Sequence, residues 1–201
     1  MRARLLPLDK CPTSRWSGGV TRELLIWPLQ ATYRDRDFLF RLSVATLENA
    51  VSTYTRLPGV RRKLMLLKGR LELHHDGGEP HVLDPFQQLS FLGEWNTTCA
   101  GTGCDFNLML RETARGEIAP LFLAAGEQMH LPLCPDMDEQ RFLLIYPQLG
   151  AVMLNCSAFT GRLETGAVFL AQLDHGNTLD DLTVINDSSA PFCGAMATVE
   201  L

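Results

Sequence analysis

The stretch KLMLLKGRLEL, Lys63–Leu73, decides the fold that we expect for this 201-residue chain. Two short apolar runs flank Gly69, and neither run repeats its apolar residues at the spacing of an amphipathic helix. A glycine inside a strand pattern usually marks a tight bend, a bulge or a close approach of two backbones. The stretch therefore predicts two strands, Lys63–Lys68 and Arg70–His74, on either side of a bend at Gly69.

The same arrangement returns later in the chain. LIYPQLGAVML, Leu144–Leu154, again reads strand, glycine, strand, and its Gly150 follows Gly69 by about 80 residues. After each copy a turn leads into a further strand, in LDPFQQLSFL (Leu83–Leu92) and LETGAVFL (Leu163–Leu170). Units of this kind bend and close small antiparallel barrels. The repeat therefore predicts two stacked β-barrels of about 100 residues each.

Short apolar or alternating runs, separated by turn signals, make up the rest of the chain, which is typical of an all-β protein. The charged run RETARGE, 111–117, is the best candidate boundary between an N-terminal barrel, 1–112, and a C-terminal barrel, 113–201. The turn signals are LPG (57–59), HDGGEP (75–80), LDPF (83–86), DHGN (174–177) and NDSSAP (186–191). The further predicted strands are Val20–Trp27, Phe38–Thr46, Gln88–Leu92, Phe106–Arg111, Ile118–Leu123, Gln128–Leu133, Phe142–Tyr146, Ala151–Cys156, Ala167–Gln172, Asp181–Asn186 and Gly194–Val199.

Composition and charge exclude several classes of partner. The chain is 46% hydrophobic and 20% charged with a formal net charge of −5, the balance of a globular protein with a real core. Because there is no basic block, we expect no nucleic-acid partner. No apolar stretch approaches the roughly 20 residues that span a bilayer, so we expect no membrane partner. Six cysteines without a CxxC pair, and no secretion signal, favour a reduced, cytoplasmic protein.

Three strands carry polar residues where apolar ones would be expected. Arg22 shares a strand face with aliphatic residues in Val20–Trp27, and Arg41 lies on one face with Ser43. Asp105 and Asn107 share a face in CDFNLMLRE although both residue types are poor strand formers. A buried arginine needs a carboxylate or an anionic ligand as its partner. The pattern alone leaves open whether these residues line a pocket or form ordinary surface ion pairs at strand ends.

Histidines offer a weak case for a metal. His74, His75 and His81 cluster near Glu79, but adjacent histidines on a strand point to opposite faces, and HHDGGEPH reads as a hairpin turn. We therefore expect no metal and no other cofactor.

The polar motifs occur in a specific order. WSGGVTRELLIWP (16–28) precedes DFLFRLSVATL (37–47), LPGVRRKLMLLKGRLEL (57–73), DPFQQLSFLGE (84–94) and CDFNLML (104–110). In this order and spacing the chain resembles the HutD/Ves family from about Trp16 to Arg111. The family pattern has an Asn where this chain has Ser17, and commonly an acidic residue where it has Arg61.

The resemblance implies a bicupin, with two cupin-type jelly-roll barrels in one chain, and a ligand pocket in the first barrel. It also implies a ligand such as urocanate or formylglutamate, a role in restraining histidine utilisation or in a stress response, and no established catalytic activity. The motifs place Thr21, Arg22, Glu23, Arg41, Ser43, Arg62, Asp105, Asn107 and Met109 at this pocket, together with Trp16, Ser17 and Phe40.

The favoured function is therefore non-enzymatic binding of a small carboxylate, with Arg22 or Arg41 gripping the acid group. Thr21 and Asn107 would supply orienting hydrogen bonds, and Trp16, Phe40 and Met109 apolar walls. The alternative is a metal-independent isomerase or lyase acting on an acid, with Glu23 or Asp105 as the base. A partner-binding module with a vestigial pocket is a third alternative. Because cupin sheets often pair through exposed edges, a homodimer is also compatible with the sequence.

Overall fold

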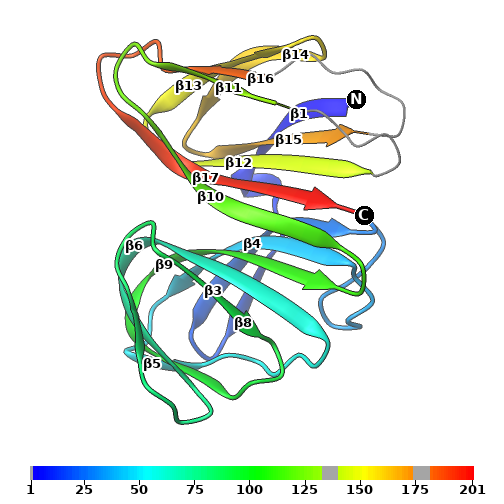
Figure 1. Cartoon of the computed structure of the whole chain (residues 1–201), viewed down its shortest axis with the longest axis vertical. Helices are drawn as coiled ribbons and strands as arrows, with labels where there is room; N and C mark the ends of the chain where they lie inside the picture. Colours follow the sequence, from blue (N-terminus) through cyan, green and yellow to red (C-terminus); the bar gives the residue numbers. More distant parts are fainter. Residues whose placement is uncertain (1, 133–139, 174–181) are drawn as a thin grey trace. The chain divides into compact units, whose positions relative to one another are not determined.

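The computed structural model describes residues 2–132, 140–173 and 182–201, which consist almost entirely of antiparallel strands (Figure 1). One 3-10 helix, η1 (Leu8–Lys10), is the only helix among these described residues. The chain divides into two compact units. We call Cys11–Ala114 the inserted unit, and Met1–Lys10 together with Arg115–Leu201 the split unit. The predicted all-β class is confirmed.

The inserted unit is built on one sheet whose main strand order is β2-β3-β4-β9-β6-β7, with β5 paired to β9 and β8 paired to β6. Its longest ladder joins β6 and β9, which pair from Val60 opposite Arg111 to His75 opposite Thr97. Apolar side chains such as Leu64, Leu71 and Phe91 pack together on this sheet. Its strands are β2 (Thr13–Trp16), β3 (Gly19–Trp27), β4 (Phe40–Leu47), β5 (Val51–Thr53), β6 (Val60–His75), β7 (His81–Leu83), β8 (Gln88–Leu92) and β9 (Thr97–Arg111).

Gly69 lies inside a single strand and does not separate two strands, so the predicted break at this residue is wrong. The residue has a φ of +97°, and the β6–β9 register shifts between Leu66 and Lys68. A bulge with a positive φ bends a strand without ending its hydrogen-bonded ladder. The bulge at Leu67 and the positive φ at Gly69 therefore leave β6 as one strand, which continues to His75.

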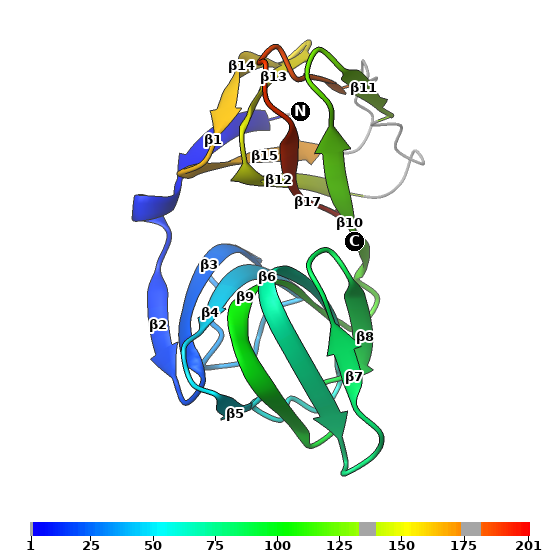
Figure 2. The same ribbon diagram turned by 90° about the vertical axis from the view of Figure 1, so that its left-hand side faces the viewer.

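The split unit contains two sheets (Figure 2). Five strands pair in the order β1-β15-β12-β17-β10, and four in the order β11-β16-β13-β14. Buried apolar side chains of both sheets, among them Leu143, Leu154, Phe169 and Val184, form one core cluster. The strands are β1 (Arg2–Pro7), β10 (Arg115–Leu123), β11 (Gln128–Leu131), β12 (Arg141–Leu149), β13 (Ala151–Cys156), β14 (Phe159–Glu164), β15 (Ala167–Leu173), β16 (Leu182–Ile185) and β17 (Phe192–Glu200).

Several predicted strands agree closely with the structure, and others were missed. β8 and β13 have the predicted bounds. β1, β2, β5, β7 and β14 were not predicted, because each is short or rich in polar residues. The predicted turn at 174–177, and residues Leu133 and Asp181 of two predicted strands, lie outside the described residues. In the part of the chain that the structure describes, no helix has the length and apolar character needed to cross a membrane.

Candidate functional site

A pocket of about 200 Å³ lies on one face of the sheet in the inserted unit. Strands β3, β4, β9 and β6 contribute most of its polar side chains, and every lining residue belongs to Cys11–Ala114. A mostly apolar wall with a few convergent polar groups is typical of a small-molecule site. The lining residues are Ser14, Arg15, Trp16, Thr21, Tyr33, Arg41, Ser43, Ala45, Tyr54, Thr55, Arg62, Asp105, Asn107 and Met109.

Strand register brings these polar residues together from distant parts of the sequence. Ser43 on β4 lies opposite Glu23 on β3 and opposite Asn107 on β9. Met109 on β9 lies between Arg41 of β4 and Arg62 of β6. Since side chains alternate between the two faces of a strand, residues paired in this way point to the same side of the sheet. The pocket face is therefore a grid of side chains from four neighbouring strands.

A bulge in β3 decides which residues of the TREL motif join this grid. The β3–β4 register shifts between Glu23 and Leu25, so Glu23 pairs with Ser43 and Ile26 pairs with Arg41. Thr21 and Glu23 are on the pocket side before the bulge, and Arg22 is on the opposite face. The bulge leaves Glu23 beside the arginine of the neighbouring strand.

Arg41 is held almost completely buried, with 4% of its surface exposed. Its Nε donates to Glu23 Oε2 at 2.7 Å, and its Nη1 donates to Ser43 Oγ at 3.3 Å. The guanidinium carbon lies 4.4 Å from the centre of the Tyr33 ring, a cation–π distance. These contacts fix the orientation of the guanidinium plane.

Arg62 is a second buried guanidinium, with 2% of its surface exposed. Its Nη2 donates to the carbonyl oxygen of Thr55 at 2.5 Å, and the guanidinium carbon lies 5.8 Å from the centre of the Tyr54 ring. Burial lowers the pKa of Arg62, although an arginine stays protonated at neutral pH. Its Nε has no hydrogen-bond partner among the described residues. This side chain therefore keeps an unused donor.

Asp105 is the only acidic side chain among the lining residues, and it is 1% exposed. The Tyr54 hydroxyl donates to Asp105 Oδ2 at 3.1 Å. Burial raises the pKa of Asp105 to about 7, against the opposing effects of the Tyr54 hydrogen bond, the Arg62 charge and the Ala45 backbone. Burial and the nearby Asp105 hold the pKa of Tyr54 well above its usual value of 10. Asp105 is thus a carboxyl group that can exchange its proton near neutral pH.

Four buried polar atoms of lining residues have no hydrogen-bond partner among the described residues. Trp16 Nε1 and Arg62 Nε are donors, and Asp105 Oδ1 and Asn107 Oδ1 are acceptors. An unpaired buried donor or acceptor costs about 1–3 kcal/mol, so native proteins rarely leave several in one place. These four atoms are the groups of the pocket that are available to hydrogen-bond a polar molecule.

Most of the residues predicted for the site are found at this pocket. Phe40 is not, because it alternates with Arg41 along β4 and faces the other side of the sheet. Ser17 is an exposed turn residue whose carbonyl accepts from Asn49 Nδ2 at 2.6 Å, and Arg22 faces away from the pocket. Glu23 contacts Arg41 but is not a lining residue. The predicted residues that do line the pocket are Trp16, Thr21, Arg41, Ser43, Arg62, Asp105, Asn107 and Met109.

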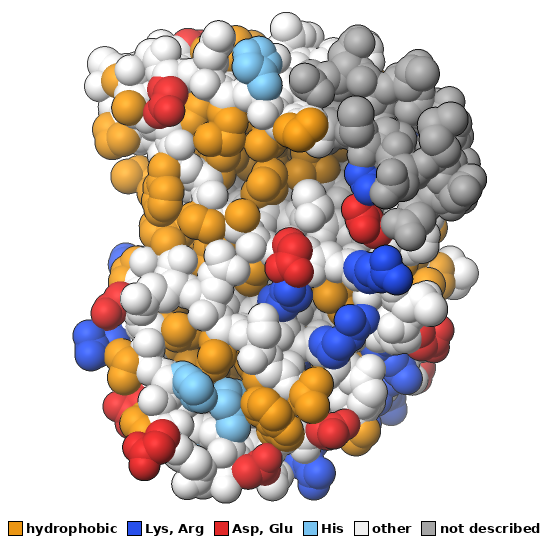
Figure 3. Space-filling view, in the orientation of Figure 1, with side chains coloured by type: hydrophobic (Ala, Val, Ile, Leu, Met, Phe, Trp, Pro, Cys, Tyr) orange, Lys and Arg blue, Asp and Glu red, His pale blue; other side chains and the backbone are white. Residues whose placement is uncertain are grey.

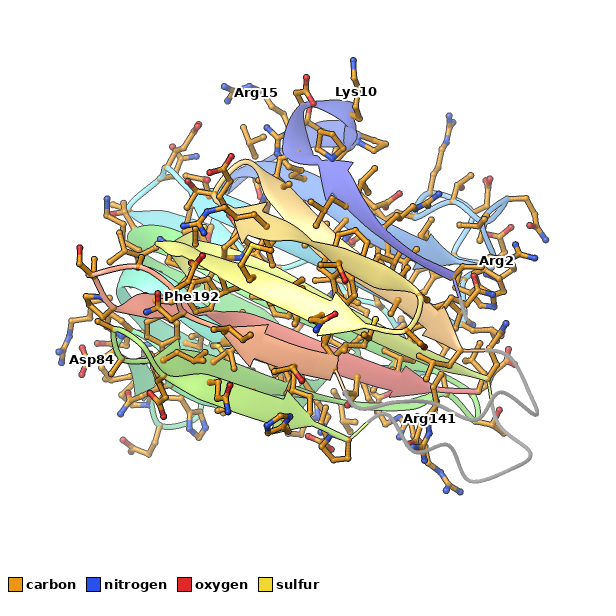
Figure 4. The ribbon with its side chains drawn as sticks, turned by 90° about the horizontal axis from the view of Figure 1, so that it is seen from above. Arg2, Lys10, Arg15, Asp84, Arg141 and Phe192 are labelled. Carbon is orange, nitrogen blue, oxygen red and sulfur yellow. The ribbon has the colours of Figure 1, made fainter. Side chains whose placement is uncertain are left out.

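The sequence reasoning missed six lining residues: Ser14, Arg15, Tyr33, Ala45, Tyr54 and Thr55. Ala45 follows from the alternation that selects Arg41 and Ser43, so this residue could have been found. Tyr33 and Tyr54 lie outside the strands, in segments whose paths no periodicity reveals. Arg15 is at the rim, where it forms an exposed ion pair with Glu48 at 3.1 Å and extends outward (Figure 4).

The donor set of the pocket does not suit a metal ion, since its lining residues offer one carboxyl group and no histidine. The histidine cluster lies elsewhere, with His74 Nε2 at 2.8 Å from Glu72 Oε1 and His75 Nδ1 at 2.9 Å from Thr97 Oγ1. Within residues 2–132, 140–173 and 182–201, no group of three or more His, Cys, Asp or Glu side chains could hold a metal. On the face shown in Figure 3, acidic and basic side chains are interspersed.

Comparison with solved structures shows a cupin-like fold. The protein PA5104 from Pseudomonas aeruginosa PAO1 aligns with a TM-score of 0.77 at 21% identity, covering 100% of this chain and 98% of that chain. HutD from Pseudomonas fluorescens SBW25 gives 0.69 at 18%, covering 99% of each chain. A cupin 2 conserved barrel domain protein from Leptotrichia buccalis gives 0.55 at 11%, covering 98% of this chain and 95% of that chain.

A search of curated proteins finds no match to this sequence. The model of the family described as HutD, in contrast, matches residues 9–175, a span that includes every residue lining the pocket. The chain therefore belongs to the HutD family.

Proposed function

We propose that this protein is a non-enzymatic bicupin that binds a small acidic metabolite in the pocket of the inserted unit. The observation that carries the proposal is the presence of two buried guanidinium groups, Arg41 and Arg62, in the lining of one pocket. Membership of the HutD family supports a link to histidine utilisation, so a ligand resembling urocanate or formylglutamate is the first choice. Binding would then modulate histidine utilisation or a stress response.

Each of the main side chains that line the pocket has a role in the proposed binding of the ligand. Arg62, whose Nε is unpartnered, and Arg41 would hold the ligand carboxylate by charge-assisted hydrogen bonds. Thr21 and Asn107 would orient the remaining polar atoms, and Trp16 with Met109 would contact the apolar part. Because Arg41 is already paired with Glu23, Arg62 has the greater capacity to accept a new anion.

Calorimetric titration with urocanate, formylglutamate and glutamate tests this proposal. Loss of a charged partner from a buried pair costs about 2–5 kcal/mol, so Arg62→Met is expected to weaken binding by about 30-fold or more. Arg70→Met is the matched control, because Arg70 forms an exposed pair with Asp84 and is not among the lining residues. The proposal fails if wild type binds none of these acids, or if Arg41→Met and Arg62→Met both bind as well as wild type.

Two cupin-type barrels in one chain are part of the proposal. Gly69 and Gly150, the central residues of the sequence repeat, both have a positive φ, of +97° and +81°. A mutant form of oxalate decarboxylase OxdC from Bacillus subtilis aligns over 96% of this chain and 76% of that chain with a TM-score of 0.66 at 6% identity.

A second candidate function is a metal-independent isomerase or lyase. It is favoured by Asp105, because a buried carboxyl group with a pKa of about 7 beside a guanidinium is suited to general acid–base catalysis. Incubating the same acids with the protein and following their proton NMR spectra would detect turnover. Spectra that stay unchanged with an acid known to bind would remove this candidate.

A further inference from the structure

The charged side chains at the pocket balance one another when Asp105 is ionised. Arg41 pairs with Glu23 at 2.7 Å, and these two charges cancel. Arg62 forms no ion pair with any described residue, but its charge acts on Asp105 and lowers the pKa of that carboxyl group. The exposed Arg15–Glu48 pair at the rim is also balanced. The two buried guanidinium groups of the pocket, together with Asp105 and the neighbouring Glu23, therefore carry no net charge.

An anionic ligand disturbs this balance. A net charge that is buried away from water is costly unless a partner neutralises it. The guanidinium groups that would hold the ligand carboxylate already face Glu23 and Asp105, so one carboxyl group has to become neutral. Glu23 Oε2 accepts from Arg41 Nε at 2.7 Å, and 21% of the Glu23 side-chain surface is exposed, so this carboxylate is both paired and in contact with solvent.

Asp105, in contrast to Glu23, is almost completely buried. The Tyr54 hydroxyl donates to its Oδ2, but its Oδ1 is buried with no partner among the described residues. A protonated carboxyl group gains a donor that an ionised one lacks. A proton on Oδ1 would therefore both restore neutrality and supply a hydrogen bond toward a ligand oxygen.

We propose that the pocket binds its carboxylate ligand together with one proton, which Asp105 takes up from solvent. This inference rests on the proposed function, since it presupposes an anionic ligand between the arginines. Asp105 then serves as a hydrogen-bond donor to the ligand, and binding strengthens as the pH falls. The O–H bond formed on Asp105 replaces a bond to hydrogen in the water or buffer molecule that gives up the proton, and no other covalent bond changes.

The groups around Asp105 leave it as the one that titrates near neutral pH. Tyr54 faces it from the segment after β5, and the pKa of that hydroxyl lies well above 10. Cys99 and Cys104 of β9 are neutral thiols, because burial and the nearby Asp105 raise the pKa of each to about 12. Arg62 of β6 stays charged. Burial brings the pKa of Asp105 itself to about 7.

Calorimetry in two buffers counts the proton directly. Formylglutamate and glutarate carry no group that titrates near neutral pH, so any proton exchanged with phosphate or Tris buffer belongs to the protein, and the count concerns the one carboxylate of each that lies between the arginines. At about pH 8 we expect uptake of close to one proton per ligand, and a Kd that rises about tenfold for each pH unit above about 7. Zero uptake with intact binding, or tighter binding at higher pH, would overturn this inference and leave the proposed function standing. Binding of neither acid would overturn this inference, and the proposed function would fall with it only if urocanate and glutamate also do not bind.

Matched variants assign the proton to its residue. Asp105→Asn keeps an acceptor for the Tyr54 hydroxyl, and it should bind with a pH-independent affinity and no proton uptake. Asp84→Asn is the control, because Asp84 lies at the surface, where it pairs with Arg70 at 3.0 Å (Figure 4). It should behave as wild type. Circular dichroism confirms that both variants fold, and proton uptake that persists in Asp105→Asn would overturn the inference.

Discussion

At the scale of single residues, burial controls the acidity of Asp105 more strongly than its neighbours do. A hydrogen bond from Tyr54 and the charge of Arg62 both favour the ionised form, yet the pKa rises from 3.8 to about 7. A carboxyl group whose pKa is higher in the folded than in the unfolded state stabilises the fold below the unfolded-state pKa. That contribution is lost as the pH rises through about 7.

Asp105→Asn is therefore expected to raise the free energy of unfolding at about pH 8, and to change it little at about pH 4. The largest gain, from the shift in pKa, is about 4 kcal/mol. Urea denaturation of both proteins over this pH range measures the difference, with Asp84→Asn as a surface control. Parallel pH profiles for wild type and Asp105→Asn would contradict the prediction.

Gly18 sets the position of the Trp16 ring at the pocket. A Cβ atom at Gly18 would lie 2.3 Å from Trp16 Cη2 and 2.7 Å from Ser52 Cβ. Gly18→Ala should displace the indole, cost about 1–3 kcal/mol of stability and weaken ligand binding. The Trp16 indole N–H resonance should shift more than those of Trp27 and Trp95. Ser17→Ala, at the exposed neighbouring position, should leave all three resonances unchanged.

The sequence predicts the site residues that lie on regular strands better than those that lie at a bulge or in irregular segments. Period-two alternation correctly groups Arg41 with Ser43, and Asp105 with Asn107 and Met109, because strand geometry fixes these faces. The same reasoning extends β3 past Glu23 with no change of face, because one sequence does not reveal a bulge. Tyr33 and Tyr54 come from irregular segments, whose positions depend on tertiary packing that no local pattern encodes.

At the scale of secondary-structure elements, the β6–β9 ladder shows why the strand bounds were predicted too short. Glycine is a strand breaker in sequence patterns, but Gly69 and Gly103 face each other across this ladder. A Cβ atom at Gly69 would lie 2.2 Å from the Thr102 carbonyl oxygen, and one at Gly103 would lie 2.3 Å from the Lys68 carbonyl oxygen. The glycines let the two backbones approach closely, so the pair bends as a unit.

Two glycine variants separate the stability cost of a positive φ from the stability cost of a clash between the two strands. Gly69 and Gly77 both have a positive φ, of +97° and +74°, but nothing lies within 4 Å of a Cβ atom at Gly77. Gly77→Ala should cost about 1 kcal/mol from the unfavourable φ alone. Gly69→Ala should cost about 2 kcal/mol more, because the ladder has to move. If thermal or urea denaturation shows equal losses of stability for the two variants, the clash at Gly69→Ala is relieved at no cost in stability.

At the scale of the whole molecule, the split and inserted units differ in how their interiors are used. The core cluster of the split unit consists of apolar side chains such as Leu154 and Phe169, both 0% exposed. The inserted unit instead places Arg41, Arg62 and Asp105 where an apolar core would stabilise it more. The described residues of the split unit include no buried charged side chain, so the proposed binding site is assigned to the inserted unit.

Leu154→Ala tests this division. Removing a buried leucine side chain costs about 2–5 kcal/mol, so the split unit should unfold at a lower urea concentration. The affinity for formylglutamate at 25 °C should stay within about twofold of wild type, since sites that share no partners contribute independently. Leu149→Ala, at a position 58% exposed, serves as the stability control. A large loss of affinity in Leu154→Ala would show that the two units are energetically coupled.

The pairing of β1 with β15 has a consequence for the order in which the chain is made. Leu5 of β1 pairs with Phe169 of β15, so β1 leaves the ribosome well before the strand with which it pairs. All strands of the inserted unit emerge in between, and their mutual pairing needs nothing from the split unit. During translation the inserted unit can therefore fold before β1 pairs with β15, and the five-stranded sheet that contains both strands forms only after β17 has also been made.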